Sequence, residues 1–416
     1  MKQTSFEEQL ALSVTQVLKT LDLPAKTLDS LNVVIGPPRI QAHGDLSLSV
    51  AMQLTKLLKQ PPLKIAEAIA LKLKDQLKKD KLDTFIQKIE VKPPGFINFV
   101  LSDAALTQTL STVLKEKDAY CQQTIGHGTK VQVEFVSANP TGPLSVAHGR
   151  QAAVGDSLAN ILSFAGFEVT REYYLNDEGR QIELLGASLL SRTQEVLGEP
   201  TTFPEEGYKG DYLKAIAQDI AKKDPKCTKE SASWFSQAAT DAILTIIRKE
   251  LDGFGVKFDV WYSQKSLHAG NKQEKALDFL KKQGTLYEKE GAWWLKSTDF
   301  GDDKDRVVVR SDGRPTYIAA DIAYHREKYA RGFKRIINLW GPDHHGYIHR
   351  IHAAVQALGH PKDSLSILII QLCTLKRGKE TIPMSTREGE FITLSQVIKE
   401  VGKDAGRFFF LMRKSD

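Results

Sequence analysis

Residues 130–175 read KVQVEFVSANPTGPLSVAHGRQAAVGDSLANILSFAGFEVTREYYL, and this stretch decides the fold class. Apolar residues at alternate positions of 130–136 indicate a buried strand, which small, turn-forming residues follow. A helix with one apolar face is predicted from near His148 to Gly166, and residues 167–175 form the next strand. Because such a strand–helix–strand unit has a right-handed crossover and builds a parallel sheet, we expect half of a nucleotide-binding fold here.

A second alternating block lies later in the chain. Strands are predicted at 306–310, 334–340 and 366–375, with a helix at 344–358. The polar, helical stretch at about 186–257 separates the two blocks and is interpreted as an insertion. The fold class is therefore α/β, a split, doubly wound parallel sheet that binds ligands at the carboxyl ends of its strands.

The chain is divided into three parts by this pattern. Residues 1–115 are expected to form a small α+β unit, with a basic helix at 63–82 whose lysines are interpreted as a solvated face rather than a nucleic-acid groove. Residues 116–390 are expected to form the α/β domain with its insertion, and residues 391–416 to begin a helical linker.

Bulk composition excludes several classes of protein. The chain of 416 residues is longer than one hydrophobic core usually organises, so more than one domain is expected. The 57 basic and 51 acidic residues permit a polyanionic partner without requiring one. The three cysteines are far apart, which argues against a disulfide framework and a thiolate metal site. With neither a signal peptide nor an apolar span, we expect a cytoplasmic protein that does not contact membranes.

The loop between the first strand and its helix carries the chemistry. A Pro/Gly turn leads into a helix whose first turn holds His148. Unpaired N–H groups and the helix dipole make such a helix start a phosphate site. The imidazole of His148 would donate a hydrogen bond to charge developing on an α-phosphate. The alternative is a histidine that only caps the helix.

The segment Asn-Pro-Thr-Gly-Pro-Leu-x-x-x-His-Gly-Arg at 139–150 resembles the HIGH motif of class I aminoacyl-tRNA synthetases, in its arginyl-tRNA synthetase form. Residues 171–177, 300–307 and 340–347 also look like bacterial members of this family, and the resemblance extends over 1–416. It implies a Rossmann-type catalytic domain of the HIGH superfamily. It also implies activation of L-arginine with ATP and Mg²⁺, without zinc, and transfer to the 3′ end of tRNA(Arg).

The resemblance assigns residues to each task. For catalysis it implies His148, Ser145, Ser385 and Arg387. For ATP binding it implies Asn139, Pro140, Thr141, Gly142, His148, Gly149, Met384 and Ser385. For arginine binding it implies Glu134, Ser137, Asn139, Tyr317, Asp321 and His344. Carboxylates suit a guanidinium because they accept its forked N–H groups. A plain structural role stays open for Glu134 and Tyr317.

Two departures from the family pattern leave alternatives open. Ser145 stands at the leading His of HIGH. Residues 383–387 look like a second motif of the family, the KMSKS loop, but Pro383 and Thr386 stand at its two Lys positions. A catalytically impaired, synthetase-like tRNA-binding protein is one alternative, and another HIGH-type nucleotidyltransferase is a second. The histidines near His345 and His349 are not interpreted as a metal site, because no nearby carboxylate or cysteine completes a ligand set.

The amino-terminal unit resembles the additional domain that contacts the tRNA elbow in this family. Phe96 and Asn98 would face the tRNA, although a sheet-core role for Phe96 is equally open. Residues 391–416 are too few for a domain, so we expect the anticodon-binding domain to be absent, tRNA affinity to be weak and the protein to be a monomer.

Overall fold

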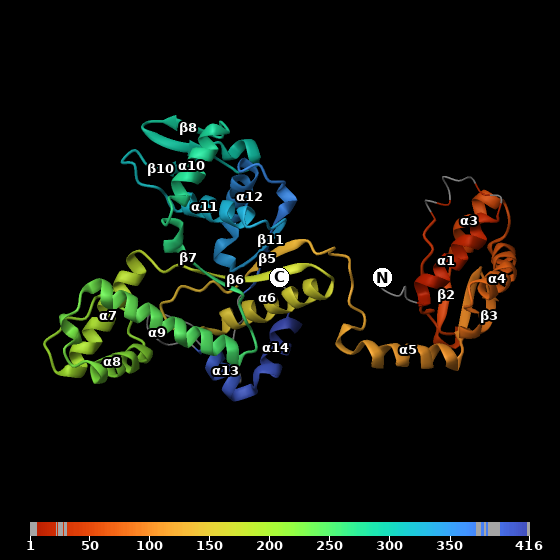
Figure 1. The fold of residues 1–416 in the computed structure, drawn as a ribbon, viewed down its shortest axis with the longest axis horizontal. Helices are drawn as coiled ribbons and strands as arrows, with labels where there is room; N and C mark the ends of the chain where they lie inside the picture. The colour runs from red at the N-terminus through yellow and green to blue at the C-terminus, as the bar shows by residue number, and fades with distance from the viewer. Residues whose placement is uncertain are drawn as a thin grey trace. The chain divides into compact units, whose positions relative to one another are not determined.

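The computed structural model describes residues 6–21, 23, 28, 31–371, 376–377, 380–381 and 392–413. The chain forms two compact units, Met1–Cys121 and Gln122–Asp416 (Figure 1). Each unit has hydrophobic cores of its own, so the two are described separately.

The first unit combines helices with a four-stranded antiparallel sheet. Its helices are α1 (Phe6–Lys19), α3 (Val50–Leu58), α4 (Pro62–Lys79) and α5 (Asp103–Glu116), with short 3-10 turns at Gln41–His43, Asp83–Phe85 and Lys117–Ala119. Its strands are β1 (Ile35–Gly36), β2 (Leu46–Leu48), β3 (Ile86–Lys92) and β4 (Phe96–Leu101), in the order β1-β2-β4-β3. The predicted basic helix is α4, which buries Ile65, Ile69 and Leu73 on one face and exposes its lysines on the other.

The second unit is built on a five-stranded parallel sheet in the order β12-β11-β5-β6-β7. The strands are β5 (Lys130–Glu134), β6 (Glu168–Leu175), β7 (Val260–Ser263), β11 (Arg335–Trp340) and β12 (Leu365–Ile369), and every neighbouring pair is parallel. The helix α6 (Val146–Phe164) joins β5 to β6, which confirms the strand–helix–strand unit. Strand order reverses between β5 and β11, so their carboxyl ends form a topological switch point.

Close packing of α6 on the sheet depends on a glycine. An ideal Cβ at Gly155 would lie 2.2 Å from Cγ of Phe135, whose side chain is fully buried. Only a residue without a side chain allows the helix to approach the sheet this closely. The middle of α6 is thereby held against Phe135, the residue that follows β5.

The predicted strand at 306–310 exists as β10 (Arg306–Val309), but the expectation that it joins the parallel sheet was wrong. It pairs antiparallel with β9 (Ala292–Leu295), which pairs with β8 (Leu286–Lys289). A short apolar run has the same appearance in either kind of sheet, so its partner was not visible in the sequence. This small sheet packs with α10 (Lys272–Lys282) and α11 (Tyr317–Ala330).

The remaining helices lie in the insertion, after β11 and near the carboxyl-terminal end of the described residues. The inserted segment contains α7 (Arg180–Leu197), α8 (Asp211–Lys223) and α9 (Ala232–Gly253), which pack on one another (Figure 1). The predicted helix at 344–358 begins as a 3-10 turn, η7 (Pro342–Tyr347), before α12 (Ile348–Ala357). Helices α13 (Leu394–Val401) and α14 (Lys403–Met412) pack against α6, and they confirm that residues 391–416 are helical where the structure describes them. Short 3-10 turns lie at Cys227–Lys229, Gln264–Leu267, Ser297–Phe300 and Lys362–Ser364, and a two-stranded ladder joins β13 (Lys376–Arg377) and β14 (Glu380–Thr381).

Within the described part of the chain, no helix has both the length and the apolar character needed to span a membrane.

Candidate active site

A cavity of about 900 Å³ lies at the switch point of the parallel sheet. Its walls come from the loop after β5, the start of α6, one face of α11 and the segment after β11. Tyr174 and Asn176, at the end of β6, add to the lining. The position matches the general location of ligand sites in doubly wound sheets.

A sharp turn carries the chain from β5 into this cavity. Val136 and Ser137 have positive φ angles of 65° and 40°, which non-glycine residues seldom adopt. The Ser137 hydroxyl stabilises the turn, because it donates to Glu134 Oε1 at 3.1 Å and accepts from the Tyr174 amide at 3.1 Å. Asn139 follows on the exposed part of the loop and donates from Nδ2 to Gln181 Oε1 at 2.9 Å.

His148 both caps the helix and presents a donor to the cavity. Its Nδ1 accepts a hydrogen bond from the Ser145 amide at 3.1 Å, and the Ser145 hydroxyl lies 3.2 Å from the same atom. Burial lowers the pKa of His148 to about 4, so the ring is neutral near pH 7. With Nδ1 accepting, the single proton resides on Nε2, which is then available as a donor to a ligand.

A face of α11 forms another wall of the cavity. Asp321 and Tyr317 are one helical turn apart and both line the cavity, Tyr317 with 88% of its surface exposed. The Tyr347 hydroxyl donates to Asp321 Oδ2 at 2.8 Å. Burial raises the pKa of Asp321 to about 6, which still leaves it mostly ionised at pH 7. A half-buried carboxylate therefore lines the same cavity as the helix start.

Glu134 differs from Asp321 in having an internal counter-charge. Lys328 is fully buried, and its Nζ lies 2.5 Å from Glu134 Oε2 and 3.0 Å from Asn338 Oδ1. Of the cations that the structure describes, none lies within ion-pair distance of Asp321. The cavity wall formed by these carboxylates consequently carries one uncompensated negative charge at neutral pH.

The neutral side chain of His325 is hydrogen-bonded to the backbone of Asp321. His325 Nδ1 lies 2.8 Å from the Asp321 carbonyl oxygen, and its Nε2 lies 3.2 Å from Asn338 Nδ2. Burial lowers the pKa of His325 to about 3. The neutral ring donates from Nδ1 to the carbonyl and accepts at Nε2, so both nitrogens are satisfied.

Glu250 on α9 connects the loop between β5 and α6 to the carboxyl-terminal helices α13 and α14. Its Oε2 accepts from the Leu144 amide at 2.8 Å, and burial raises its pKa to about 7 although hydrogen bonds from Leu144 and Ser395 oppose the shift. The Leu394 amide in turn donates to the Leu144 carbonyl at 2.7 Å. The residues that follow segment 382–391 are thus attached directly to the loop before His148.

Most residues predicted for the site and described by the structure line the same cavity: Glu134, Ser137, Asn139, Thr141, Gly142, Ser145, His148, Tyr317, Asp321 and His344. Pro140 and Gly149 do not line it. An ideal Cβ at Gly149 would lie 2.7 Å from Leu394 Cδ1, so that glycine admits α13 close to α6. Met384, Ser385 and Arg387, with the departures at Pro383 and Thr386, lie outside the described residues.

The two residues predicted to face tRNA lie on β4 of the first unit. Phe96 is partly buried, whereas Asn98 is 2% exposed and accepts from the Ser47 hydroxyl at 2.7 Å. Their contact with tRNA remains a prediction.

Sequence reasoning missed several residues of the cavity and its support. Tyr324, His325 and Lys328 follow Asp321 at spacings of three, four and seven, so the helical period offered a signal for them. Tyr347 offered none, because its contact with Asp321 depends on how two separate elements pack.

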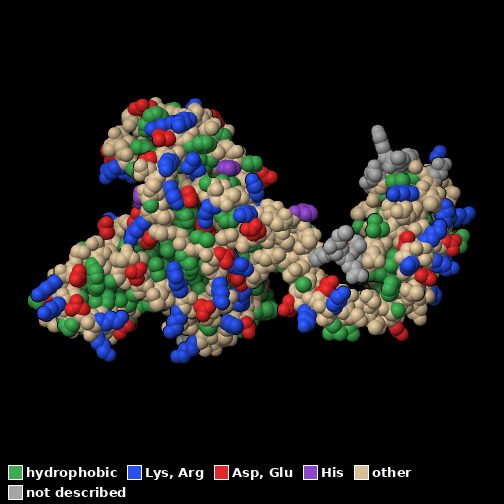
Figure 2. Space-filling model, in the orientation of Figure 1, with side chains coloured by type: hydrophobic (Ala, Val, Ile, Leu, Met, Phe, Trp, Pro, Cys, Tyr) green, Lys and Arg blue, Asp and Glu red, His purple; other side chains and the backbone are tan. Residues whose placement is uncertain are grey.

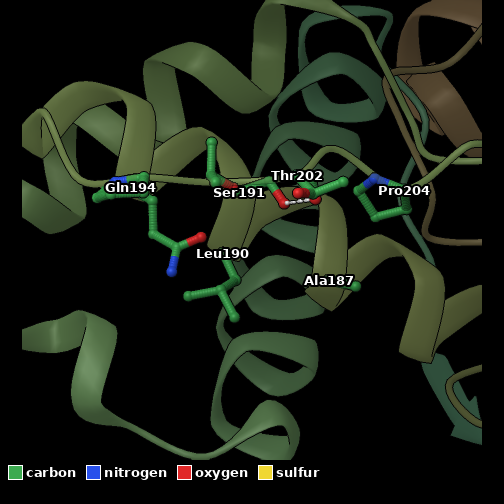
Figure 3. Close-up of a pocket in the computed structure, with 8 residues that line it drawn as sticks. Ala187, Leu190, Ser191, Gln194, Thr202 and Pro204 are labelled. Carbon is green, nitrogen blue, oxygen red and sulfur yellow. Dashed lines mark hydrogen bonds between the residues drawn. The ribbon is translucent and has the colours of Figure 1, made fainter.

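A second hollow lies in the helical insertion and has no comparable chemistry. It measures about 460 Å³ and is lined by Leu190, Ser191, Gln194 and Thr202 among others (Figure 3). The Ser191 hydroxyl donates to the Thr202 carbonyl at 3.3 Å, and none of the lining side chains is charged. The cavity at the switch point is therefore the candidate active site.

Comparison with known proteins agrees with the motif. A family model described as "tRNA synthetases class I (R), catalytic domain" matches residues 109–410, and one for the arginyl tRNA synthetase N terminal domain matches residues 8–101. Arginine–tRNA ligase of Geobacter sp. (strain M21) is 49% identical over 384 residues, which cover 91% of this chain and 68% of that protein. Arginine–tRNA ligase 1 of Halalkalibacterium halodurans is 44% identical over 421 positions, covering 100% of this chain and 74% of its own. The Thermus thermophilus arginyl-tRNA synthetase structure has the same fold, with a TM-score of 0.60 and 20% identity over 98% of this chain and 74% of that one.

Proposed function

Because this chain belongs to the arginyl-tRNA synthetase family, with a class I catalytic domain at 109–410, we propose that its cavity binds ATP and L-arginine together and activates arginine as arginyl-adenylate. The activated arginyl group is then transferred to the 3′ end of tRNA(Arg). The observation that carries this proposal is the shared cavity, which has the helix start with His148 on one wall and Asp321 on the other.

The reaction requires positioning and charge stabilisation. The arginine carboxylate attacks the α-phosphorus, an oxygen–phosphorus bond forms, and the bond to the departing pyrophosphate breaks on the opposite side. The Nε2–H of His148 and the N–H groups at the start of α6 stabilise negative charge on the phosphate oxygens. No side chain becomes covalently attached, so orientation of the two substrates supplies much of the acceleration.

Arginine is bound through both of its ends. Asp321 accepts N–H groups of the guanidinium, with the Tyr317 hydroxyl one turn away. Glu134 contributes less direct charge, because Lys328 already neutralises it. Ser137, Asn139 and His344 also line the cavity, and we propose that they hold the α-amino and carboxylate groups.

The nucleotide enters as its magnesium complex, which is the substrate. Mg²⁺ retains several waters and usually binds phosphate oxygens with only one or two carboxylates. Among the described residues, no three His, Cys, Asp or Glu side chains converge as a metal site. Thr141 and Gly142 line the cavity and are proposed to bind the nucleotide, and Ser385 and Arg387 are proposed to contact the phosphates.

The remaining assignments concern the whole protein. Residues 1–115 are proposed to contact the tRNA elbow, and the catalytic domain to span 116–390. A cytoplasmic monomer is proposed, and the buried free thiol of Cys227 suits a reducing compartment.

Arginine-dependent exchange between pyrophosphate and ATP, measured with tRNA present, tests this function. We expect His148→Ala to reduce the exchange rate about 100-fold or more, because it removes a donor to the reacting phosphate. Exposed His349, outside the cavity, provides the control His349→Ala, which should leave the rate unchanged.

Three outcomes would contradict the proposal. An unchanged rate in His148→Ala removes this residue from the mechanism. Exchange driven by an amino acid other than arginine favours a different nucleotidyltransferase. Binding of tRNA without exchange in the wild type favours a catalytically impaired tRNA-binding protein, the alternative that the departures at Ser145, Pro383 and Thr386 support.

A further inference from the structure

A neutral phenol, rather than a cation, holds the uncompensated carboxylate of the cavity. The Tyr347 hydroxyl donates to Asp321 Oδ2 at 2.8 Å, and both side chains line the cavity. Tyr347 ends the 3-10 turn η7, whereas Asp321 lies in α11, so the bond connects two separate walls.

The Tyr347 side chain is itself fixed in place. The centroid of the Tyr347 ring lies 6.4 Å from that of Trp340. The Arg350 guanidinium lies over one face of the Tyr347 ring, 4.4 Å from its centroid. Burial and the nearby charge of Asp321 raise the pKa of the Tyr347 hydroxyl well above its usual value. The phenol therefore stays protonated and keeps donating throughout the neutral range.

This bond determines how Asp321 presents its oxygens. Oδ2 uses one lone pair on Tyr347, which fixes the rotation of the carboxylate about its last single bond. Oδ1 and the second lone pair of Oδ2 remain for a ligand. A planar guanidinium needs two acceptors in one plane, whereas an ammonium group needs only one acceptor at any rotation.

We propose that Tyr347 is a positioning residue for arginine, whose hydroxyl fixes the plane of the Asp321 carboxylate so that it accepts two parallel N–H groups of a guanidinium. This inference rests on the proposed function, in which Asp321 binds the arginine side chain. Tyr347 acts through Asp321 and favours arginine over lysine by orientation.

The variant Tyr347→Phe removes only the hydroxyl and keeps the ring. Its matched control is Tyr329→Phe, which removes a hydroxyl bonded at 2.7 Å to Ser364 Oγ, outside the cavity. Binding of L-arginine and of ATP to the full-length chain is measured by isothermal titration calorimetry, which needs no turnover. Thermal unfolding of each variant is followed in parallel. The stoichiometry of ATP binding gives the fraction of each variant that is folded.

We expect Tyr347→Phe to weaken arginine binding about ten-fold, the size expected for a hydrogen bond to a charged group, with unchanged ATP affinity. The preference for arginine over lysine should fall with it. Tyr329→Phe should change neither affinity. Arginine affinity that is unchanged in Tyr347→Phe, or arginine and ATP affinities that fall equally, would overturn the inference.

A pH series adds a readout that a purely structural role would not move. Glu134 on β5, Lys328 on α11, Tyr174 on β6 and His344 on η7 are titratable groups that also act on Asp321, and His325 on α11 is bonded to its carbonyl oxygen. All of these groups remain in the phenylalanine variant. Loss of the phenol donor should raise the pKa of Asp321 further, so the acidic loss of arginine affinity moves to higher pH. An unshifted pH profile would contradict the proposed contact.

Asp321→Asn separates failure of the inference from failure of the function. If it binds arginine like the wild type, the proposed arginine site is wrong. If it loses arginine while Tyr347→Phe binds normally, the site stands and only the role of Tyr347 is rejected.

Discussion

At the scale of single residues, charge pairing distinguishes the carboxylates around the cavity. Glu134 is paired with buried Lys328, whereas Asp321 is held by a phenol. The motif resemblance identified both carboxylates from the sequence. It could not distinguish their states, because Lys328 lies 194 positions from Glu134 and nothing local relates the two.

The buried pair gives a prediction about stability. Lys328→Met should destabilise the second unit by about 3–5 kcal/mol, because it leaves Glu134 buried without a counter-charge. Lys272→Met, which breaks a partly exposed pair with Glu327, should cost at most about 1 kcal/mol. Urea denaturation of both variants measures the difference.

The double variant Glu134→Gln/Lys328→Met provides a check on the cause. It should recover much of the stability, because no isolated charge remains buried. Equal losses in Lys328→Met and Lys272→Met would show that burial of the lysine is unimportant.

At the scale of elements, local periodicity was sufficient for some predictions and not for others. The unit β5–α6–β6 was predicted because its strand and helix patterns are contiguous and strong. The strand β10 was found but assigned to the wrong sheet, since its three valines, Val307 to Val309, carry no information about their partner. The cavity was predicted at the carboxyl ends of the strands because topology alone determines that position.

Glu250 on α9 is bonded to the loop before α6 and to α13, and its contribution to the free energy of unfolding should depend on pH. Its pKa is about 7 in the folded protein against 4.5 ordinarily, so the native state binds the proton more tightly than the unfolded chain. This group therefore contributes stability that is fully present below about pH 4.5 and lost as pH rises through about 7. In Glu250→Gln this pH-dependent component should be absent.

The test compares unfolding free energies of wild type and Glu250→Gln between about pH 4.5 and 8. The stability of the wild type should fall relative to that of the variant across this window. A constant difference between the two proteins would show that Glu250 does not titrate there.

At the scale of the whole molecule, charge gave little guidance to function. Lys and Arg side chains are interspersed with Asp and Glu over the face shown in Figure 2. A net charge of +6 spread in this way locates no partner, and the motif had to do so instead. Composition could therefore bound the class of protein without naming its substrate.

The two units should unfold separately, because each has a core of its own. We expect residues 1–121, expressed alone, to fold with a sharp denaturation transition. Calorimetry of the full chain should show two transitions, one of which matches the fragment. A single cooperative transition in the full chain, together with an unfolded fragment, would contradict this division.

The pairing of β5 with β11 has a consequence during synthesis. The nascent chain releases β5 about 200 residues before its partner, which at ribosomal speeds is about 10–40 s. During that interval β5 can pair only with β6, and its other edge is unpaired. The nascent domain is therefore most prone to associate with other chains at this stage. Both walls of the candidate active-site cavity come together only after β11 has been synthesised.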